Sequence, residues 1–376
     1  MPAHCDFISR RALAVDASGI RKVFDLAAKM ADPINLSIGL PDFDVPEIAK
    51  RAAIDAIEAG HNRYTQTQGI APLRERLRKD LSAEFGRDVG EVLITSGVSG
   101  GLLLAILATI DPGDEAIFLD PYFVMYKHLL TLVGGKPVIV DSYPDFRFHA
   151  DRVEKAITPH TKLLILNSPS NPTGIVMTEA EVKSAVDLAR KRDLLLISDE
   201  IYEPFLYDEP REGGRGLPSP ARLYDCTLVL RGFSKSHAMT GWRLGYAAGP
   251  DAIISQMTKL QQYTFVCAPS PMQYAALKAL DVPMRDVVDA YRRKRDLVYG
   301  RLSGKFQIAR PQGAFYIFPQ APAGQRGSDF VAKAIQRNVL MIPGNVFSER
   351  DTHFRISYAT SDEKLEKGCE ILLSMA

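Results

Sequence analysis

Short apolar runs that alternate with helical patterns are the feature that most constrains how this chain of 376 residues can fold. The runs are rich in Val, Ile and Leu and lie at residues 91–95, 115–120, 137–141, 162–167, 194–199, 227–230 and 244–248. Stretches between them, such as Glu179–Arg192, repeat apolar residues at helical spacing. Continuous apolar strands separated by helices are typical of a mainly parallel sheet with both faces covered. The pattern therefore predicts an α/β fold.

The two ends of the chain differ from this central pattern. Glu47–Ala59 is an expected helix that follows Pro46 and stops at Gly60, as helix termini prefer. After two prolines at 269 and 271 come a charged helical stretch (284–302), strand-like runs (313–318, 339–342 and 354–359) and a helix in which Thr360 and Glu363 have capping-box spacing. We predict an N-terminal arm (residues 1–44) that packs on the small domain, a large domain (45–268) and a small α/β domain (269–376). A binding site would then lie between the two lobes.

Charge and composition argue against several classes of protein. Lys plus Arg is 46 and Asp plus Glu is 45, a net charge of +1, so no electrostatic force favours nucleic acid or an anionic membrane as a partner. The longest apolar run, residues 101–110, is roughly half of a membrane span, and the N-terminus lacks the apolar core of a secretory signal. The four cysteines (Cys5, Cys226, Cys267 and Cys369) have neither CxxC spacing nor His partners. They indicate free thiols in a cytoplasmic protein and no metal site.

Polar and aromatic residues directly follow the central apolar runs. In open parallel sheets, ligands bind beyond the carboxyl ends of the strands, where loop amides and helix N-termini meet. The residues at these positions are Thr95 to Ser99, Asp120 to Phe123, Asn167 to Asn171, Asp199 with Tyr202, and Ser234 with Lys235. Loops that only turn the chain do not need so many such groups, so we expect a ligand site at this edge of the sheet.

The glycine- and serine-rich segment 95–101 allows two different chemistries. It precedes the apolar helix 102–110, where backbone N–H groups and the helix dipole favour an anion such as phosphate. The same segment fits the GxSxG elbow of serine hydrolases, with Ser99 as nucleophile and Asp199 with His237 or His353 as partners. The hydrolase hypothesis lacks a His-Gly-Gly oxyanion loop upstream and gives the other strand ends no role.

Three charged residues at strand ends suit chemistry, although each could also be structural. Asp199 ends an apolar run, so its carboxylate needs a cationic or hydrogen-bonding partner. Lys235 lies between two serines in a glycine-containing loop, where a buried amine can lose enough basicity to act as a nucleophile. Arg243 begins the last central run and would complete a phosphate clamp with the glycine-rich turn.

Several motifs of the chain resemble those of the class I/II aminotransferases, which are pyridoxal-phosphate enzymes of fold type I. The motifs are IGLPDF (38–43), NSPSNPTG (167–174), SDEIY (198–202), GFSK (232–235), WRLG (242–245) and FRIS (354–357). They span nearly the whole chain, and SGIRK (18–22) favours the aspartate and aromatic aminotransferase branch. The resemblance implies a large domain with a mainly parallel sheet and a smaller α/β domain at the C-terminus.

The resemblance also implies a role for each residue around the cofactor ring. Lys235 would hold the cofactor as a Schiff base and then move the proton between substrate and cofactor. Asp199 would keep the pyridine nitrogen protonated. The remaining ring contacts would come from Tyr202 and Asn171 at the ring oxygen and from Phe123 and Ile201 on the two ring faces.

Further contacts implied by the resemblance concern the phosphate and the substrate. Gly97, Val98, Ser99, Ser234 and Arg243 would hold the phosphate. Arg355 would bind the substrate α-carboxylate in a bidentate fork, beside Asn171 and Gly39. Tyr64 would reach the phosphate of a neighbouring subunit, which implies a homodimer with shared active sites.

We therefore predict a cytoplasmic aminotransferase with amino acid and 2-oxo acid substrates. It would move an amino group from an L-amino acid, aspartate or aromatic, to a 2-oxo acid such as 2-oxoglutarate by a ping-pong mechanism. A carbon–sulfur β-lyase would use the same Lys235 and Asp199 and remains an alternative beside the hydrolase. Departures from the family pattern at Leu40, Gly232 and residues 97–99 weaken any transfer of substrate preference.

Overall fold

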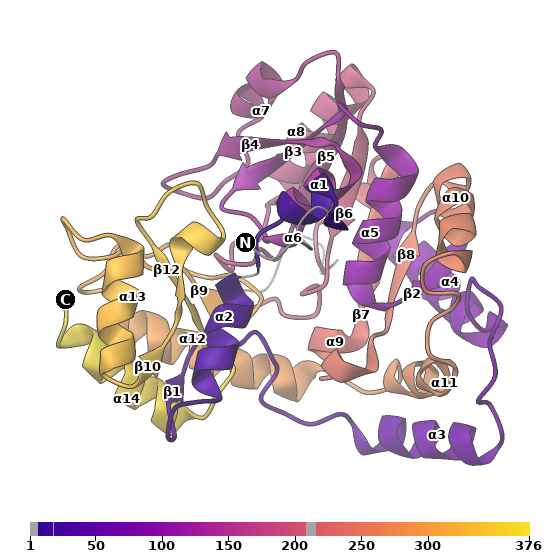
Figure 1. The fold of residues 1–376 in the computed structure, drawn as a ribbon. Coiled ribbons are helices and arrows are strands. Elements are labelled where there is room, and N and C mark those ends of the chain that lie inside the picture. Colours follow the sequence, from indigo (N-terminus) through magenta and orange to yellow (C-terminus); the bar gives the residue numbers. More distant parts are fainter. Residues whose placement is uncertain (1–6, 18, 208–215) are drawn as a thin grey trace.

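The computed structural model describes residues 7–17, 19–207 and 216–376, and a seven-stranded sheet lies at its centre (Figure 1). The strand order is β2-β8-β7-β6-β5-β3-β4. The strands are β2 (Val92–Thr95), β3 (Glu115–Asp120), β4 (Lys136–Asp141), β5 (Thr161–Asn167), β6 (Leu195–Asp199), β7 (Thr227–Gly232) and β8 (Gly245–Ala248). Only β8 is antiparallel to its neighbours in this described sheet. The predicted mainly parallel sheet is confirmed, and the strand bounds differ from the expected ones by one or two residues at most.

Helices cover both faces of the sheet because side chains alternate along each strand. Leu163 and Ile165 of β5 pack on one face with α5 (Gly97–Thr109), α6 (Met125–Val133) and α10 (Asp251–Gln262). Leu164 and Leu166 pack on the other face with α7 (Ala150–Ala156) and α8 (Glu179–Arg192). All four side chains are 3% exposed or less, so each contributes about 1.5–3 kcal/mol through burial.

Two helix starts test the capping patterns in the sequence. Thr178 and Glu181 form a full capping box at the start of α8, whose bounds match the predicted helix. The expected cap at Thr360 is wrong, because the residue that caps α14 (Asp362–Leu373) is Ser361. The Ser361 hydroxyl accepts a hydrogen bond from the Lys364 N–H at 3.4 Å, and this shifts the helix start by one residue.

A second, smaller sheet forms from the C-terminal part of the chain. It has the order β11-β12-β9 and is antiparallel, with β9 (Tyr316–Ile317), β11 (Ile342–Pro343) and β12 (Phe354–Ser357). The helices α12 (Arg285–Leu302), α13 (Gly327–Gln336) and α14 gather around it (Figure 1). The single strand expected at 339–342 is wrong, because the run divides into β10 (Val339–Leu340) and β11, which pair with different partners.

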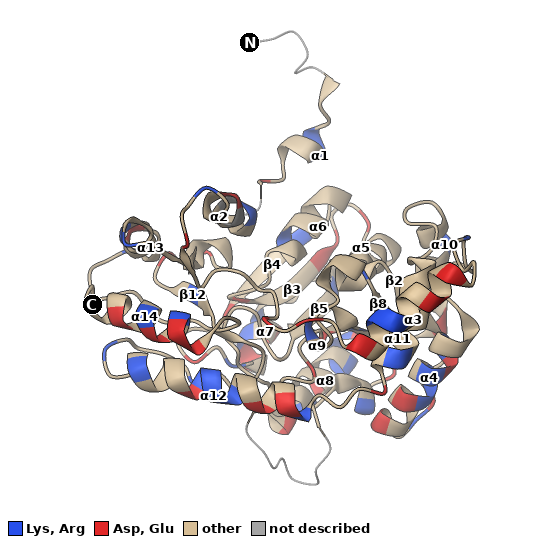
Figure 2. Cartoon of the chain, turned by 90° about the horizontal axis from the view of Figure 1, so that it is seen from below, with Lys and Arg blue, Asp and Glu red and all other residues tan. Residues whose placement is uncertain are grey.

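The N-terminal segment contacts both parts of the molecule. β1 (Ile34–Asn35) pairs in parallel with β10, and α2 (Gly19–Ala27) packs on the small sheet around Phe318 and Phe347. The short helix α1 (Arg10–Leu13) instead contacts α6 and stands outside the body of the molecule in Figure 2. The segment therefore crosses the gap between the two sheets.

The remaining α-helices of the described chain are α3 (Glu47–Glu58), α4 (Ala71–Phe85), α9 (Phe233–Ser236) and α11 (Ser270–Ala279). Of these, α4 contacts β2 of the central sheet, and α3 packs on α11 (Figure 1). The expected helix after Pro46 is confirmed and ends before Gly60, which has a φ of 84°. Figure 2 shows acidic and basic residues interspersed along α3, α4 and α12. Among the described residues, every helix is too short or too polar to cross a bilayer.

Candidate active site

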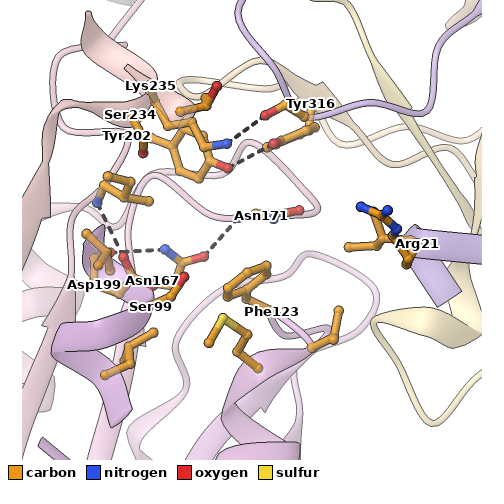
Figure 3. Close-up of a pocket in the computed structure, with 18 of the residues that line it drawn as sticks. Arg21, Ser99, Phe123, Asn167, Asn171, Asp199, Tyr202, Ser234, Lys235 and Tyr316 are labelled. Atoms are coloured by element: carbon orange, nitrogen blue, oxygen red, sulfur yellow. Dashed lines mark hydrogen bonds between the residues drawn. The ribbon is translucent and has the colours of Figure 1, made fainter. Parts of the chain in front are cut away.

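A cavity of about 670 Å³ lies at the carboxyl ends of the central strands (Figure 3). The small sheet and the N-terminal segment form its other walls. Of the residues predicted for the site, those that line the cavity are Gly39, Val98, Ser99, Phe123, Asn171, Asp199, Ile201, Tyr202, Ser234, Lys235, Arg243 and Arg355. Gly97 lies just behind the wall, and Tyr64 lies outside the cavity with 84% of its surface exposed.

The amine of Lys235 projects into this cavity from α9. Its Nζ donates a hydrogen bond of 2.6 Å to the carbonyl oxygen of Gly39 in the N-terminal segment. Burial, together with the positive charges of Arg355 and Arg243, lowers the pKa of Lys235 from 10.5 to about 8. A neutral, nucleophilic amine is therefore accessible near neutral pH.

Asp199, at the end of β6, is a buried carboxylate. Oδ2 accepts a hydrogen bond of 2.6 Å from the Tyr126 hydroxyl, and Oδ1 accepts one of 3.3 Å from the Ile201 N–H. No Lys, Arg or His of the described chain forms an ion pair with it. Burial therefore raises the pKa of Asp199 to about 6. A cation placed against this carboxylate would restore the ionised form.

Arg355 of β12 joins the two sides of the site. Its Nη1 donates to Asn171 Oδ1 at 2.9 Å, and its Nη2 donates to the Ser37 carbonyl at 2.7 Å. The guanidinium lies between the rings of Tyr316 and Phe347, 4.4 and 4.6 Å from their centroids. Its buried Nε has no hydrogen-bond partner among the described residues. The guanidinium is thus held in place, and its Nε remains available to donate a hydrogen bond to an anion.

An asparagine pair holds the loop that carries Asn171. The Asn171 N–H donates to Asn167 Oδ1 at 2.9 Å, and Asn167 Nδ2 donates to the Asp199 carbonyl at 3.0 Å. These bonds tie the ends of β5 and β6 together. The Asn171 side chain is therefore free to point at Arg355.

The start of α5 and Arg243 form a cradle for an anion. The first N–H groups of α5 have no intrahelical partner, as in any helix, and the Ser96 side chain does not cap them. Gly97 has a φ of 68°, and a Cβ there would lie 2.8 Å from Arg243 Nη2. Arg243 itself has a φ of 54°, an uncommon conformation for a residue with a side chain. Backbone and guanidinium meet this closely only because residue 97 is a glycine.

Comparison with known proteins places the chain in a family. It belongs to the family "Aminotransferase class I and II", whose sequence model matches residues 31–372. It is 38% identical to a probable aspartate aminotransferase of Methanocaldococcus jannaschii, over 97% of this chain and 98% of that protein. It is 37% identical to an aromatic-amino-acid aminotransferase 2 of Thermococcus litoralis, over 96% of each. The structure of an aspartate aminotransferase from Thermus thermophilus with maleate superposes with a TM-score of 0.92 at 36% identity, over 98% and 99% of the two chains.

The predicted family, fold type I and aminotransferase activity are therefore confirmed, and the enzyme depends on pyridoxal phosphate. The residues present fit this cofactor. Asp199 is a buried carboxylate without a cation, which a protonated ring nitrogen supplies. The uncapped start of α5 and Arg243 offer an anion site in the cavity wall, and Lys235 offers an amine in the same cavity.

The two alternative functions are not favoured by these comparisons. The hydrolase also fails on geometry, because neither proposed histidine lines the cavity that contains Ser99. His237 Nδ1 hydrogen-bonds with the Ser236 hydroxyl at 2.7 Å, and His353 Nδ1 with Thr352 Oγ1 at 2.9 Å. The three proteins named above are aminotransferases by name, which favours transamination over the carbon–sulfur lyase.

The sequence analysis missed two tyrosines that complete the site. Tyr126, in the first turns of α6, donates to Asp199, and Tyr316 of β9 hydrogen-bonds with Tyr202. Tyr126 lies three residues beyond the strand-end segment 120–123, so its position in a helix close to that segment was the available signal. For Tyr316 the only sequence signal was its place in a strand-like run. Nothing in the local sequence shows which face of a short strand will contact another domain.

Proposed function

We propose that this aminotransferase takes an aromatic L-amino acid as its preferred donor, before aspartate, and 2-oxoglutarate as its acceptor. The observation that carries the proposal is the wall beside Arg355 and Lys235. Apart from the residues assigned to the cofactor and the carboxylate, that wall is mainly apolar, with Val15, Ile20 and Leu40 among its members. An apolar wall accepts a ring at no electrostatic cost, whereas a second carboxylate must find a cation in the cavity.

The acceptor 2-oxoglutarate carries a second carboxylate, which needs a cation. Arg21 of α2 lines the same cavity, on the side opposite Asp199 in the view of Figure 3. Its side chain is 71% exposed and pairs with Asp25 at 3.2 Å, an exposed ion pair of a kind that contributes little to stability. We propose that Arg21 receives this distal carboxylate. The enzyme would then accept an aromatic donor and a dicarboxylate acceptor in turn.

We further propose the following division of roles at the cofactor. Bound pyridoxal phosphate supplies an electron sink for the electrons released at the substrate α-carbon. Asp199 would hold a proton at the ring nitrogen, and Tyr202 and Asn171 would donate to the ring oxygen. The phosphate contacts would come from Gly97, Val98, Ser99, Ser234 and Arg243, and Phe123 and Ile201 would cover the ring faces.

The same proposal assigns the substrate contacts and the proton transfer. Arg355 binds the α-carboxylate and so fixes the α-carbon near Lys235, with the Gly39 backbone beside it. Lys235 Nζ, whose pKa is lowered to about 8 so that the neutral amine is accessible near neutral pH, would be the base that takes the α-proton. The Gly39 carbonyl, which accepts a bond from Nζ, keeps the amine on this side of the cavity.

We propose a cytoplasmic homodimer with shared sites. Tyr64 is exposed and does not line the cavity of its own chain. Both properties are expected of a residue that contributes to the site of a partner subunit. Ile54 and Ile57 of α3 are also more than 40% exposed, and an interface would cover such apolar groups. The domain bounds at residues 44/45 and 268/269 belong to this proposal, supported by the separate sheets on either side of them.

The visible absorbance of the purified enzyme with pyridoxal phosphate tests the donor. We expect L-phenylalanine and L-tyrosine to bleach the band at lower concentrations than L-aspartate, and 2-oxoglutarate to restore it. In Arg21→Ala the KM for 2-oxoglutarate should rise about tenfold, the value of one charged contact, while the KM for phenylalanine stays unchanged. A lower KM for aspartate than for phenylalanine would contradict the donor preference. Pyruvate and ammonia formed without an acceptor would indicate the β-lyase.

Two single variants separate this function from hydrolysis. Lys235→Ala should lose at least about a thousandfold in kcat, because no other amine can move the α-proton. Ser99→Ala should keep most of kcat and bind the cofactor several-fold less tightly. The reverse pattern would support the hydrolase.

A further inference from the structure

We propose that Tyr316 is a positioning residue that links carboxylate binding at Arg355 to the hydrogen-bonding strength of Tyr202. The inference rests on the proposed roles of those two residues and adds a third one between them. Tyr316 lies on β9 of the small sheet, whereas Tyr202 follows β6 of the central sheet. The pair thus crosses from one sheet to the other at the cavity.

The first link is the contact between the two hydroxyls. Their oxygens are 2.8 Å apart, and the two side chains point at each other in Figure 3. Both residues are 3% exposed or less. Among the described residues, neither hydroxyl has another hydrogen-bond partner. Each hydroxyl has one proton, so only one of them can donate within the pair.

The direction of this bond follows from the role of Tyr202. If Tyr202 donates its proton to the cofactor ring oxygen, Tyr316 must donate to Tyr202. A hydroxyl that accepts a hydrogen bond becomes a stronger donor, because the bonds of a chain polarise each other. Tyr316 would therefore strengthen the contact of Tyr202 with the ring oxygen and favour the anionic form of that oxygen.

The second link is the contact between Tyr316 and Arg355. The guanidinium carbon lies 4.4 Å from the Tyr316 ring centroid, and the positive charge opposes the effect of burial on the pKa of Tyr316. The charge thus makes the Tyr316 hydroxyl a better donor. A substrate carboxylate on Arg355 neutralises this charge and weakens the donation. Carboxylate binding at Arg355 therefore weakens the hydrogen bond that Tyr316 donates to Tyr202.

Gly39 gives independent evidence that the position of the Tyr316 hydroxyl is specified. A Cβ at residue 39 would collide with that hydroxyl, so glycine is required for Tyr316 to reach Tyr202. The carbonyl of Gly39 also accepts the bond from Lys235 Nζ. The hydroxyl is thus packed against the backbone that holds the amine.

The test is a pH titration of the visible absorbance of the enzyme loaded with pyridoxal phosphate. In Tyr316→Phe the ring under Arg355 remains and only the hydroxyl is lost. We expect the titration midpoint to rise by about half a unit to one unit, since the anionic ring oxygen loses support. Maleate, a dicarboxylate without an amino group, should raise the wild-type midpoint by neutralising Arg355, and in Tyr316→Phe this rise should be at least twofold smaller. The KM of the amino acid donor should change less than twofold.

Tyr358→Phe is the matched control. Tyr358 is fully buried in the same cluster, and its hydroxyl donates to the Ala314 carbonyl at 3.2 Å without lining the cavity. This variant should leave the midpoint unchanged. Equal midpoints for wild type, Tyr316→Phe and Tyr358→Phe would overturn the proposal, as would equal shifts in both variants.

A double variant keeps the test decisive if one variant alone is unstable. In a Tyr202→Phe background, Tyr316→Phe should move the midpoint no further, because Tyr316 acts through Tyr202. Additive shifts would contradict this. The titration needs only the bound cofactor. If the wild-type absorbance band titrates with pH but is not bleached by amino acids, the proposed function is refuted while the role of Tyr316 stays testable.

Discussion

Asp199 shows at the scale of one residue how a catalytic group conflicts with folding. Its carboxyl has an ordinary pKa of 3.8 and a folded pKa of about 6, because burial penalises the charge. The folded chain without cofactor therefore binds this proton more tightly than the unfolded chain does. Stability from this group is present at low pH and is lost as the pH rises from 3.8 to about 6. Above that range the free energy of unfolding that the buried charge removes stays constant.

Asp199→Asn should therefore stabilise the cofactor-free protein at pH 7.5 by up to about 3 kcal/mol, since an amide carries no charge and still accepts from Tyr126. The gain should vanish below pH 4. Activity of the loaded enzyme should fall at least about a hundredfold, because the ring nitrogen loses its anionic partner. Denaturant unfolding at both pH values checks the first part, with the exposed Asp55→Asn as control. A less stable variant at pH 7.5 would mean that the wild-type carboxylate is not penalised.

Residue identities in the site could be predicted where the family motifs cover them. Lys235, Asp199, Asn171 and Arg355 all line one cavity, as expected from their motifs. Tyr126 and Tyr316 could not be predicted in the same way. Their contacts depend on which helix turn faces Asp199 and on how the small sheet meets the central one, and neither is encoded in a local pattern.

At the scale of the element, strands were easier to predict than helix caps. The central strands are buried on both faces, so an unbroken apolar run marks each of them, as the fully buried Leu196 and Ile197 show in β6. A cap depends on one side chain and on the backbone around it. Two neighbouring hydroxyls, Thr360 and Ser361, both precede α14, and the sequence alone favours the one with a glutamate three residues on. The structure has the other.

Replacement of these two hydroxyls tests the cap directly. Ser361→Ala should destabilise the protein by about 1 kcal/mol, because the Lys364 N–H loses its acceptor. Thr360→Ala should change the free energy of unfolding by less than about 0.5 kcal/mol. Urea unfolding of the two variants gives both values. Similar losses in both would show that the helix start is shared between the two residues.

At the scale of the whole molecule, pairing between distant segments is what the sequence left open. β1 lies about 300 residues from its partner β10 in the chain, and two residues of strand carry no recognisable signal. The pairing matters because it fixes the segment that brings Gly39 and Arg21 to the cavity. The site is therefore assembled from both ends of the chain and from the central sheet.

The proposed homodimer makes the strongest prediction at this scale, because it requires each site to use two chains. A Lys235→Ala chain is inactive but still carries Tyr64 for its partner's phosphate. A Tyr64→Ala chain keeps Lys235 but should bind the cofactor about ten- to a hundredfold more weakly, the loss of one charged hydrogen bond.

When the two variants are unfolded together and refolded with limiting cofactor, half of the dimers formed at random are hybrids. Each hybrid has one site with a native lysine from one chain and a native tyrosine from the other. Activity should therefore recover to roughly a quarter of the wild-type value, well above either variant alone. Refolding each variant separately is the control. Without recovery, and with a monomer in sedimentation, Tyr64 would serve no partner, and the complete active site would have to come from the one chain described here.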